Sequence, residues 1–253
     1  MLGKLLKYDL RSMVKQFAFI WPAALAIAVV NRLMLSHFIE RPTEFVATTY
    51  TVSMLIYFSF LVALCVLSIV FVVQRFYKGL LGDEGYLMFT LPVKSWQLIT
   101  SKLLCAMVVA IVSTVVGFLS MYALFPLDEI EFATVKIMIK DLFAPQHLSA
   151  WLELLAIAVS GMLQVYLLIY LSIAIGHLFN KHRVAISFAV YIAINSFWQI
   201  LTGLFGLEHL ETLTPESDPL HLTIWVCVII DLLKSAVYFV ITNYILKHRV
   251  NLE

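Results

Sequence analysis

The sequence predicts an all-α polytopic membrane protein with six transmembrane helices. Hydrophobic residues make up 62% of the 253-residue chain and charged residues only 13%, whereas soluble globular proteins contain about 45–50% and about 25% of these classes. Several apolar runs exceed the ~18 residues from which a membrane-spanning helix is inferred. We therefore expect residues 1–253 to form a single transmembrane domain.

Charge and cysteine usage narrow the possible functions. The formal net charge is +1, so no basic face indicates nucleic-acid binding. Cys65, Cys105 and Cys227 lie in apolar runs and show no metal-ligand spacing. We expect them to be small buried hydrophobic residues, without a metal or disulfide role.

An amphipathic helix is predicted for residues 1–16. Four basic and four apolar residues recur at helical spacing on opposite faces: Lys4, Lys7, Arg11 and Lys15 against Leu6, Leu10, Met13 and Phe17. Such a helix before a span is typical of one that lies in the membrane surface, with its basic face toward anionic lipid headgroups. A signal peptide is the alternative, but the apolar run that follows is long and has no clear cleavage site.

The six apolar runs place the spans at about 17–35, 50–74, 100–125, 151–178, 184–205 and 222–246. Pro22 near the start of the first span is tolerated because the early amides of a helix lack partners. The second span is free of charge. In the third, Ser113, Gly117 and Ser120 are spaced to form a small-residue face for close helix approach.

Three polar segments separate consecutive spans, in addition to residues 75–99, which are described below. Residues 36–49 form a short loop. Residues 126–150, bracketed by Pro126 and Pro145, predict a short amphipathic helix on the membrane surface, because apolar residues recur there at helical spacing. Residues 206–221 form an acidic loop without Lys or Arg.

The distribution of basic residues predicts the orientation. Six spans place both termini on one side, and the flanks on that side carry twelve Lys and Arg residues against four on the other. Because basic residues concentrate in cytoplasmic flanks, we expect both termini and residues 75–99 to face the cytoplasm.

Residues 75–99 combine turn chemistry, charge and large apolar side chains between the second and third spans. Gly79, Gly82 and Gly85 permit tight turns, and Asp83-Glu84 can begin a short helix that contains Tyr86, Leu87, Met88 and Phe89. Pro92 ends this helix, and Ser95 can cap the next one. Side chains of this kind either anchor a protein partner or dip into the lipid interface, and physical reasoning alone leaves both open.

Polar residues inside two spans are candidates for a pathway. Asp231 and Lys234 form an i, i+3 charge pair in the sixth span, which is either a structural pair or a charge that lines a path for protons, ions or substrate. A polar stripe follows one face of the fifth span: Ser187, Tyr191, Asn195, Gln199 and Thr202. The stripe either joins helices or lines a translocation path, with Tyr191, Asn195, Gln199 and Thr202 as the path residues.

Catalytic motifs are missing from the sequence. It contains no phosphate-binding loop, no H-E-x-x-H and no G-x-S-x-G, so we expect neither catalytic residues nor a nucleotide site in this chain. His177 and His182 at the end of the fourth span have no third ligand nearby, and we expect them to hydrogen-bond at the interface.

The run Tyr77 to Val93, with Trp96-Gln97-Leu98 and Ser101-Lys102-Leu103 behind it, resembles the cytoplasmic segment of ABC-2-type transporter permeases from Gram-positive bacteria. The opening Leu5-Leu6-Lys7-Tyr8-Asp9-Leu10-Arg11 is similar to the start of the same proteins, and the topology agrees over the whole chain.

The resemblance implies the permease subunit of an ATP-driven exporter in the bacterial cytoplasmic membrane. A separately encoded ATPase would bind ATP and Mg, so this chain needs no cofactor. The coupling helix would contact that ATPase through the following residues: Gly82, Asp83, Glu84, Gly85, Tyr86, Met88 and Phe89. A second permease subunit, identical or related, would complete the path, which spans 2 and 5 would line.

The uncharged stripe favours an amphipathic substrate such as a peptide, lipid or drug. One alternative is a non-transporting membrane sensor or immunity protein that binds a peptide or protein partner. Another is an ion-coupled carrier that uses Asp231 and Lys234.

Overall fold

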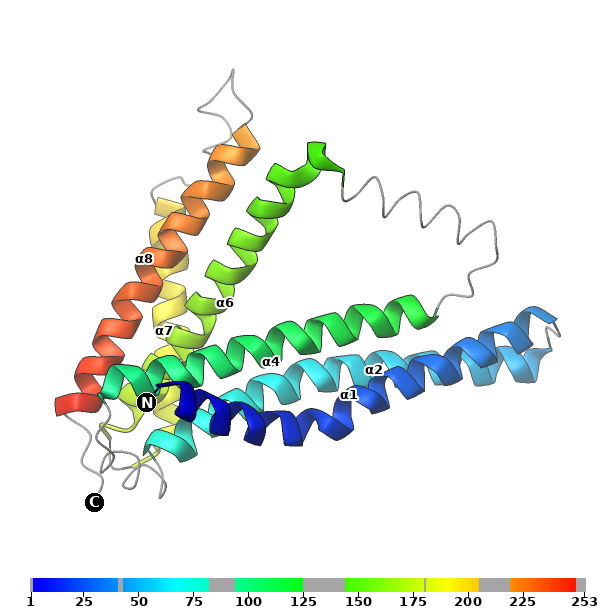
Figure 1. Ribbon diagram of the computed structural model, residues 1–253, viewed down its shortest axis with the longest axis horizontal. Coiled ribbons are helices and arrows are strands. Elements are labelled where there is room, and N and C mark those ends of the chain that lie inside the picture. Colours follow the sequence, from blue (N-terminus) through cyan, green and yellow to red (C-terminus); the bar gives the residue numbers. More distant parts are fainter. Residues whose placement is uncertain are drawn as a thin grey trace. The chain divides into compact units, whose positions relative to one another are not determined.

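The computed structural model describes residues 2–40, 43–81, 94–124, 144–179, 181–204 and 219–248, and every regular element among them is a helix (Figure 1). The α-helices are α1 (Leu2–Glu40), α2 (Glu44–Phe76), α4 (Ser95–Leu124), α6 (Leu148–Gly176), α7 (Arg183–Leu204) and α8 (Pro219–His248). A π-helix, η1 (Tyr77–Leu81), continues α2, and a 3-10 turn, η2 (Pro145–His147), precedes α6.

All six α-helices are long and apolar enough to cross a membrane, so the predicted number of spans is confirmed for the described residues. Each helix begins before its predicted apolar run, and in α2 and α4 a polar side chain outside the apolar run caps the start. The Val46 amide donates to Thr43 Oγ1 at 3.3 Å, which begins α2 at Glu44 rather than near residue 50.

The start of α4 differs from the prediction that Ser95 caps it. Ser95 is already helical, and Lys94 precedes it in the cap position. The Lys94 amide donates to Gln97 Oε1 at 3.4 Å, and the Gln97 amide donates to Lys94 O at 2.9 Å. Gln97 therefore supplies the return hydrogen bond of a capping box.

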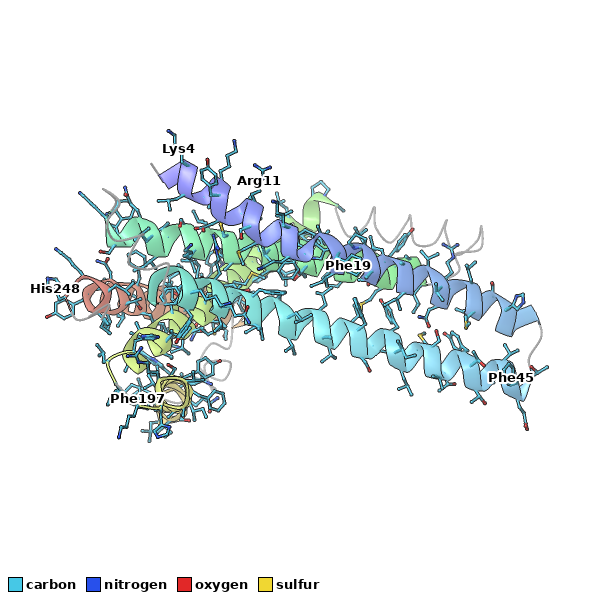
Figure 2. All side chains as sticks on the ribbon, turned by 90° about the horizontal axis from the view of Figure 1, so that it is seen from below. Lys4, Arg11, Phe19, Phe45, Phe197 and His248 are labelled. Carbon is cyan, nitrogen blue, oxygen red and sulfur yellow. The ribbon has the colours of Figure 1, made fainter. Side chains whose placement is uncertain are left out.

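The predicted interface helix and first span form one continuous helix, α1, which contains Pro22 in its interior. Lys4, Lys7, Arg11 and Lys15 are all exposed, whereas Met13 and Phe17 are buried. Figure 2 shows Lys4 and Arg11 projecting from the outside of α1. The two opposed faces are therefore present, and the location of residues 1–16 in the membrane surface stays a prediction.

Three predicted segments fall largely outside the described residues. These are the coupling helix within residues 82–93, most of the surface helix at 126–150 and most of the acidic loop at 206–221, whose last three residues belong to α8. Of the second segment, the structure describes η2 and the first residues of α6.

The chain divides into two compact units. Unit 1 comprises Met1–Val72 with Leu104–Phe143, and unit 2 comprises Val73–Leu103 with Ala144–Glu253. In unit 1, helices α1, α2 and α4 lie side by side and are joined by hydrogen bonds between neutral side chains (Figure 1). Trp21 Nε1 donates to Ser113 Oγ at 3.1 Å, and Ser53 Oγ donates to Asn31 Oδ1 at 2.7 Å.

The predicted small-residue face on α4 is present in part. Ser113 and Ser120 are buried, and Ser120 Oγ lies 3.0 Å from the Tyr57 hydroxyl of α2. At Gly117, however, a Cβ atom would have no neighbouring atom within 4 Å. The two hydroxyls therefore hold the contact through hydrogen bonds, and the glycine is not a point of close helix approach.

In unit 2, α6 packs against both α7 and α8. The turn from α6 to α7 is tight, since a Cβ at Gly176 would lie 2.7 Å from the Arg183 carbonyl oxygen and would also collide with Ser187. His182 in this turn has φ = 57°, a left-handed conformation that only a few per cent of non-glycine residues adopt. Gly176 thus allows α7 to begin directly beside the end of α6.

Candidate functional site

The seven predicted coupling residues, Gly82 to Gly85, Tyr86, Met88 and Phe89, lie outside the described residues, but both flanks of their segment are described. The flanks, residues 73–81 and 94–103, belong to unit 2 together with α6, α7 and α8. The base of the predicted coupling segment is therefore built into the C-terminal helix bundle.

Aromatic contacts attach the first flank to the end of α6. The Phe76 ring stacks on Tyr170 with ring centres 4.0 Å apart and planes 8° apart, and both side chains are buried. The Tyr77 ring lies 4.9 Å from the His177 ring. Such stacked aromatic pairs contribute about 0.5–1.5 kcal/mol beyond the area that they bury.

The two flanks also meet each other. Gly79 in η1 faces Lys102 of α4, and a Cβ at Gly79 would lie 3.1 Å from Lys102 Nζ. Lys102 itself is buried, at 2% exposure. The glycine leaves room for the lysine side chain, since a Cβ atom at this position would crowd it. The π-helical turn at Tyr77–Leu81 was not predicted, and such turns occur frequently at functional sites.

His177 forms a ring contact instead of the predicted interfacial hydrogen bond. Its Nε2 is buried and has no hydrogen-bond partner among the described residues. Burial, and next the positive charge of Arg183, lower the pKa of His177 below that of an ordinary histidine. The imidazole beside Tyr77 is therefore neutral near pH 7.

The five residues of the predicted stripe on α7 differ in their burial. Ser187, Tyr191, Asn195 and Thr202 are half-buried, whereas Gln199 is exposed. The hydroxyls of Ser187 and Thr202 both donate to carbonyl oxygens of α7 itself, at 2.9 Å to Arg183 O and 3.0 Å to Trp198 O. These two hydroxyls are satisfied without a second helix.

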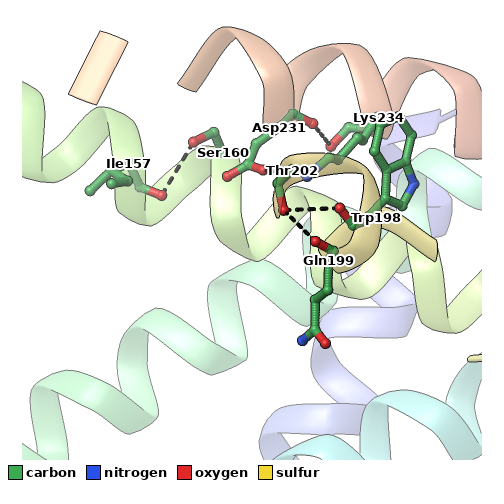
Figure 3. Close-up of polar contacts among 8 residues, drawn as sticks. Ile157, Ser160, Trp198, Gln199, Thr202, Asp231 and Lys234 are labelled. Atoms are coloured by element: carbon green, nitrogen blue, oxygen red, sulfur yellow. Dashed lines mark hydrogen bonds and ion pairs between the residues drawn. The ribbon is translucent and has the colours of Figure 1, made fainter. Parts of the chain in front are cut away.

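The charge pair on α8 lies near Trp198 of α7. Lys234 Nζ is 3.7 Å from Asp231 Oδ1 and 4.9 Å from the centre of the Trp198 ring. Figure 3 shows Ser160 of α6, Thr202 of α7 and the Asp231–Lys234 pair in one region of unit 2. The predicted charge pair is thus present, and an aromatic ring beside the ammonium adds a cation–π contact.

A contact between two ionisable side chains joins α6 and α8 and was not predicted. Glu153 Oε1 lies 2.5 Å from Nδ1 of His221, with side-chain exposures of 8% for the glutamate and 43% for the histidine. Both residues lie near the N-termini of their helices, where a carboxylate is favoured by the helix dipoles. The sequence signal was a lone acidic residue in the first turns of a span, and His221 was counted as part of the acidic loop.

An apolar pocket of about 420 Å³ lies between the end of α1 and the start of α2 in unit 1. Its lining is almost entirely apolar and includes one imidazole: Val30, Leu33, Met34, His37, Phe45, Val46 and Thr49. Among the described residues, no group of three or more His, Cys, Asp or Glu side chains could hold a metal ion.

Comparison of the chain with protein-family models, with curated proteins and with solved structures gives no match. The membrane-protein character therefore rests on the six helices themselves.

Proposed function

We propose that this chain is the permease subunit of an ATP-driven exporter of the ABC-2 type. The observation that carries the proposal is the run Tyr77 to Val93, which resembles the coupling segment of that family and lies between two helices capable of spanning a membrane. In this function the chain moves an amphipathic substrate outward across a bacterial cytoplasmic membrane, and both termini are cytoplasmic.

Energy comes from a separate ATPase subunit, which holds ATP and Mg, because the sequence has no phosphate-binding loop. Residues Asp83 to Phe89 contact that subunit. A second permease subunit completes the translocation path, which α7 lines through Tyr191, Asn195, Gln199 and Thr202.

The contacts at the base of the segment support a route for the motion. A displacement of residues 82–93 acts first on η1 and the end of α2. The Phe76–Tyr170 stack and the Tyr77–His177 contact join that end to α6. Gly176 brings α6 against the start of α7. The motion therefore reaches the proposed path helix through two parallel ring contacts with α6 and then through the close approach of α6 to α7 at Gly176.

The proposal is tested by purifying the tagged protein in mild detergent and identifying an ATPase subunit that co-elutes with it. The complex is then reconstituted in liposomes with three variants: Glu84→Lys, Tyr86→Ala and Phe89→Ala. We expect each to insert normally and to lose substrate-stimulated ATP hydrolysis. Unchanged stimulation in all three would remove the coupling role, and the absence of any co-eluting ATPase would favour the non-transporting sensor or immunity protein.

The route is tested by Phe76→Ala and Tyr170→Ala, singly and together. Because the two rings form one contact, the double variant should lose no more stimulation than either single variant. Phe58→Ala is the matched control, since Phe58 lies on the same helix and is 51% exposed. Additive losses would show that the stack does not transmit the motion.

A further inference from the structure

Side chains of three helices meet in unit 2 around the charge pair of α8. This α6–α7–α8 junction consists of Gln164 on α6, Trp198 on α7, and Asp231, Lys234 and Tyr238 on α8. Lys234 Nζ lies over the Trp198 ring, and the Tyr238 hydroxyl lies close to the side chains of Gln164 and Trp198 without meeting the geometry of a hydrogen bond to either. Figure 3 shows Trp198 and Lys234 adjacent at this point.

The Tyr238 hydroxyl is the first sign that the junction accepts a ligand. Tyr238 is 3% exposed, and its buried hydroxyl meets the geometry of a hydrogen bond with no described residue. A buried hydroxyl without a partner destabilises a folded protein. Buried polar groups in native proteins are almost always satisfied, by the protein, by water or by a ligand. The junction thus holds a donor that is available to a bound molecule.

The loose charge pair is the second sign. The 3.7 Å between Lys234 Nζ and Asp231 Oδ1 exceeds hydrogen-bond length. The two side chains retain 12% and 25% of their exposure, respectively. An ammonium has three donors and a carboxylate has two acceptor oxygens, so each charge has capacity for a second partner from outside the bundle.

The charges of the junction select the ligand. One positive and one negative charge lie within a helix long and apolar enough to span a membrane, where an uncompensated charge is unfavourable. A cationic or anionic ligand would pair with one group and leave a net charge. A ligand that carries both an ammonium and an anionic group pairs with both and leaves none.

We propose that the α6–α7–α8 junction binds the headgroup of a zwitterionic amphiphile. The ammonium of the ligand lies against Asp231, and its anionic group accepts hydrogen bonds from Lys234 and from the Tyr238 hydroxyl. Its alkyl chain lies along the apolar surface of the bundle. This names the substrate class of the proposed exporter and rests on that function, but binding itself requires only this chain.

The test uses the full-length protein in uncharged maltoside micelles, in a form whose one tryptophan is Trp198. Quenching of Trp198 fluorescence reports the binding of three probes with the same alkyl chain: dodecylphosphocholine, dodecyltrimethylammonium and dodecyl phosphate. We expect the zwitterionic probe to bind at least tenfold more tightly than the other two. Equal binding of all three would overturn the proposal.

Substitutions should change the preference in opposite directions. Lys234→Met leaves the carboxylate and should shift the preference to dodecyltrimethylammonium. Asp231→Asn leaves the ammonium and should shift it to dodecyl phosphate. Tyr238→Phe should weaken zwitterion binding about two- to tenfold, the equivalent of one hydrogen bond. The matched control is Thr242→Ser, also on α8, which should change nothing. Retention of the zwitterion preference in both charge variants would mean that the pair is structural.

A final arm separates an amphiphile from a free zwitterion. Glycerophosphocholine carries the same headgroup without an alkyl chain, and we expect it to bind more than a hundredfold more weakly, since each buried methylene contributes about 0.8 kcal/mol. Equal binding would overturn the assignment to an amphiphile. No ATPase subunit is present in these experiments, so their outcome is independent of whether the export proposal holds.

Discussion

The two units of the chain differ in the polar side chains that accompany the packing of their apolar helices. In unit 1, the interhelical contacts Trp21–Ser113, Asn31–Ser53 and Tyr57–Ser120 join neutral side chains. In unit 2, Glu153–His221 joins α6 and α8 through ionisable groups, and Asp231–Lys234 adds a charge pair on α8. Hydrogen bonds between neutral side chains join membrane helices without placing a charge in the hydrocarbon. A charged side chain within a span has a high free-energy cost.

This difference assigns separate roles to the units. The three hydrogen bonds of unit 1 join neutral side chains and serve helix packing. Unit 2 contains the base of the predicted coupling segment, the α7 stripe and the two contacts between ionisable side chains. Features of proposed function therefore concentrate in unit 2, and substitutions there should have the larger effects.

The largest effect is expected at the tight turn of unit 2. Gly176→Val places side-chain atoms against Arg183 O and Ser187, and this overpacking should destabilise the protein by at least about 3 kcal/mol. Gly161→Ala on the same helix is the matched control, because nothing lies within 4 Å of its added methyl group, and it should be neutral or stabilising. Thermal unfolding in detergent measures both. Equal stability of the two variants would show that α6 and α7 do not approach closely.

The next effect is expected at the buried carboxylate. Glu153→Leu leaves His221 without its partner and should cost about 1–3 kcal/mol. Adding His221→Leu should recover part of that loss, since replacing both partners by apolar groups can be nearly neutral. Leu154→Ala, at an exposed neighbouring position, should change stability by less than about 0.5 kcal/mol. A double variant that is less stable than Glu153→Leu would contradict the pairing.

A smaller effect is expected in unit 1. Ser120 Oγ donates to Gly117 O at 2.8 Å, so the Tyr57 hydroxyl is the donor to Ser120 Oγ. Tyr57→Phe removes this hydrogen bond and should cost about 0.6–1.5 kcal/mol. Tyr122→Phe, at an exposed position of α4, should cost nothing measurable. If the Tyr57 variant lost more stability than Glu153→Leu, the contrast between the units would be wrong.

The smallest effect concerns pH. The pKa of His177 is lower in the folded protein than in the unfolded chain. At a pH between these two pKa values, the unfolded chain therefore binds more protons than the folded protein. The contribution of the neutral imidazole to stability is therefore complete above about pH 6.5, the ordinary histidine value, and is lost as the pH falls below it. His177→Phe retains the ring contact with Tyr77 and should remove this loss between pH 8 and pH 5. The exposed His248→Phe should leave it in place. A pH profile unchanged by His177→Phe would assign the dependence to other groups.

The sequence predicted the helices well and their contacts poorly. Apolar runs identify spans because length and composition decide whether a helix can cross a membrane. Boundaries were missed where a polar residue begins the helix, as Thr43 and Gln97 do. The continuity of α1 was missed because a change from amphipathic to apolar pattern, with Pro22 nearby, was interpreted as the end of one helix.

The sequence pattern does not reveal which side chains of two different helices contact each other. Asp231 and Lys234 were found because they are neighbours on one helix. Glu153 and His221 are 68 residues apart, and neither is conspicuous alone. The position of Trp198 over Lys234 likewise depends on how α7 and α8 pack.

The central claim is that residues 82–93 receive energy from a separate ATPase and pass it into unit 2. The most direct measurement is substrate-stimulated ATP hydrolysis by the reconstituted complex, comparing wild type with Glu84→Lys. We predict that the variant assembles in the membrane, keeps its basal hydrolysis and loses the stimulation. Full stimulation in the variant, or a purified wild-type protein that never associates with an ATPase, would contradict the account.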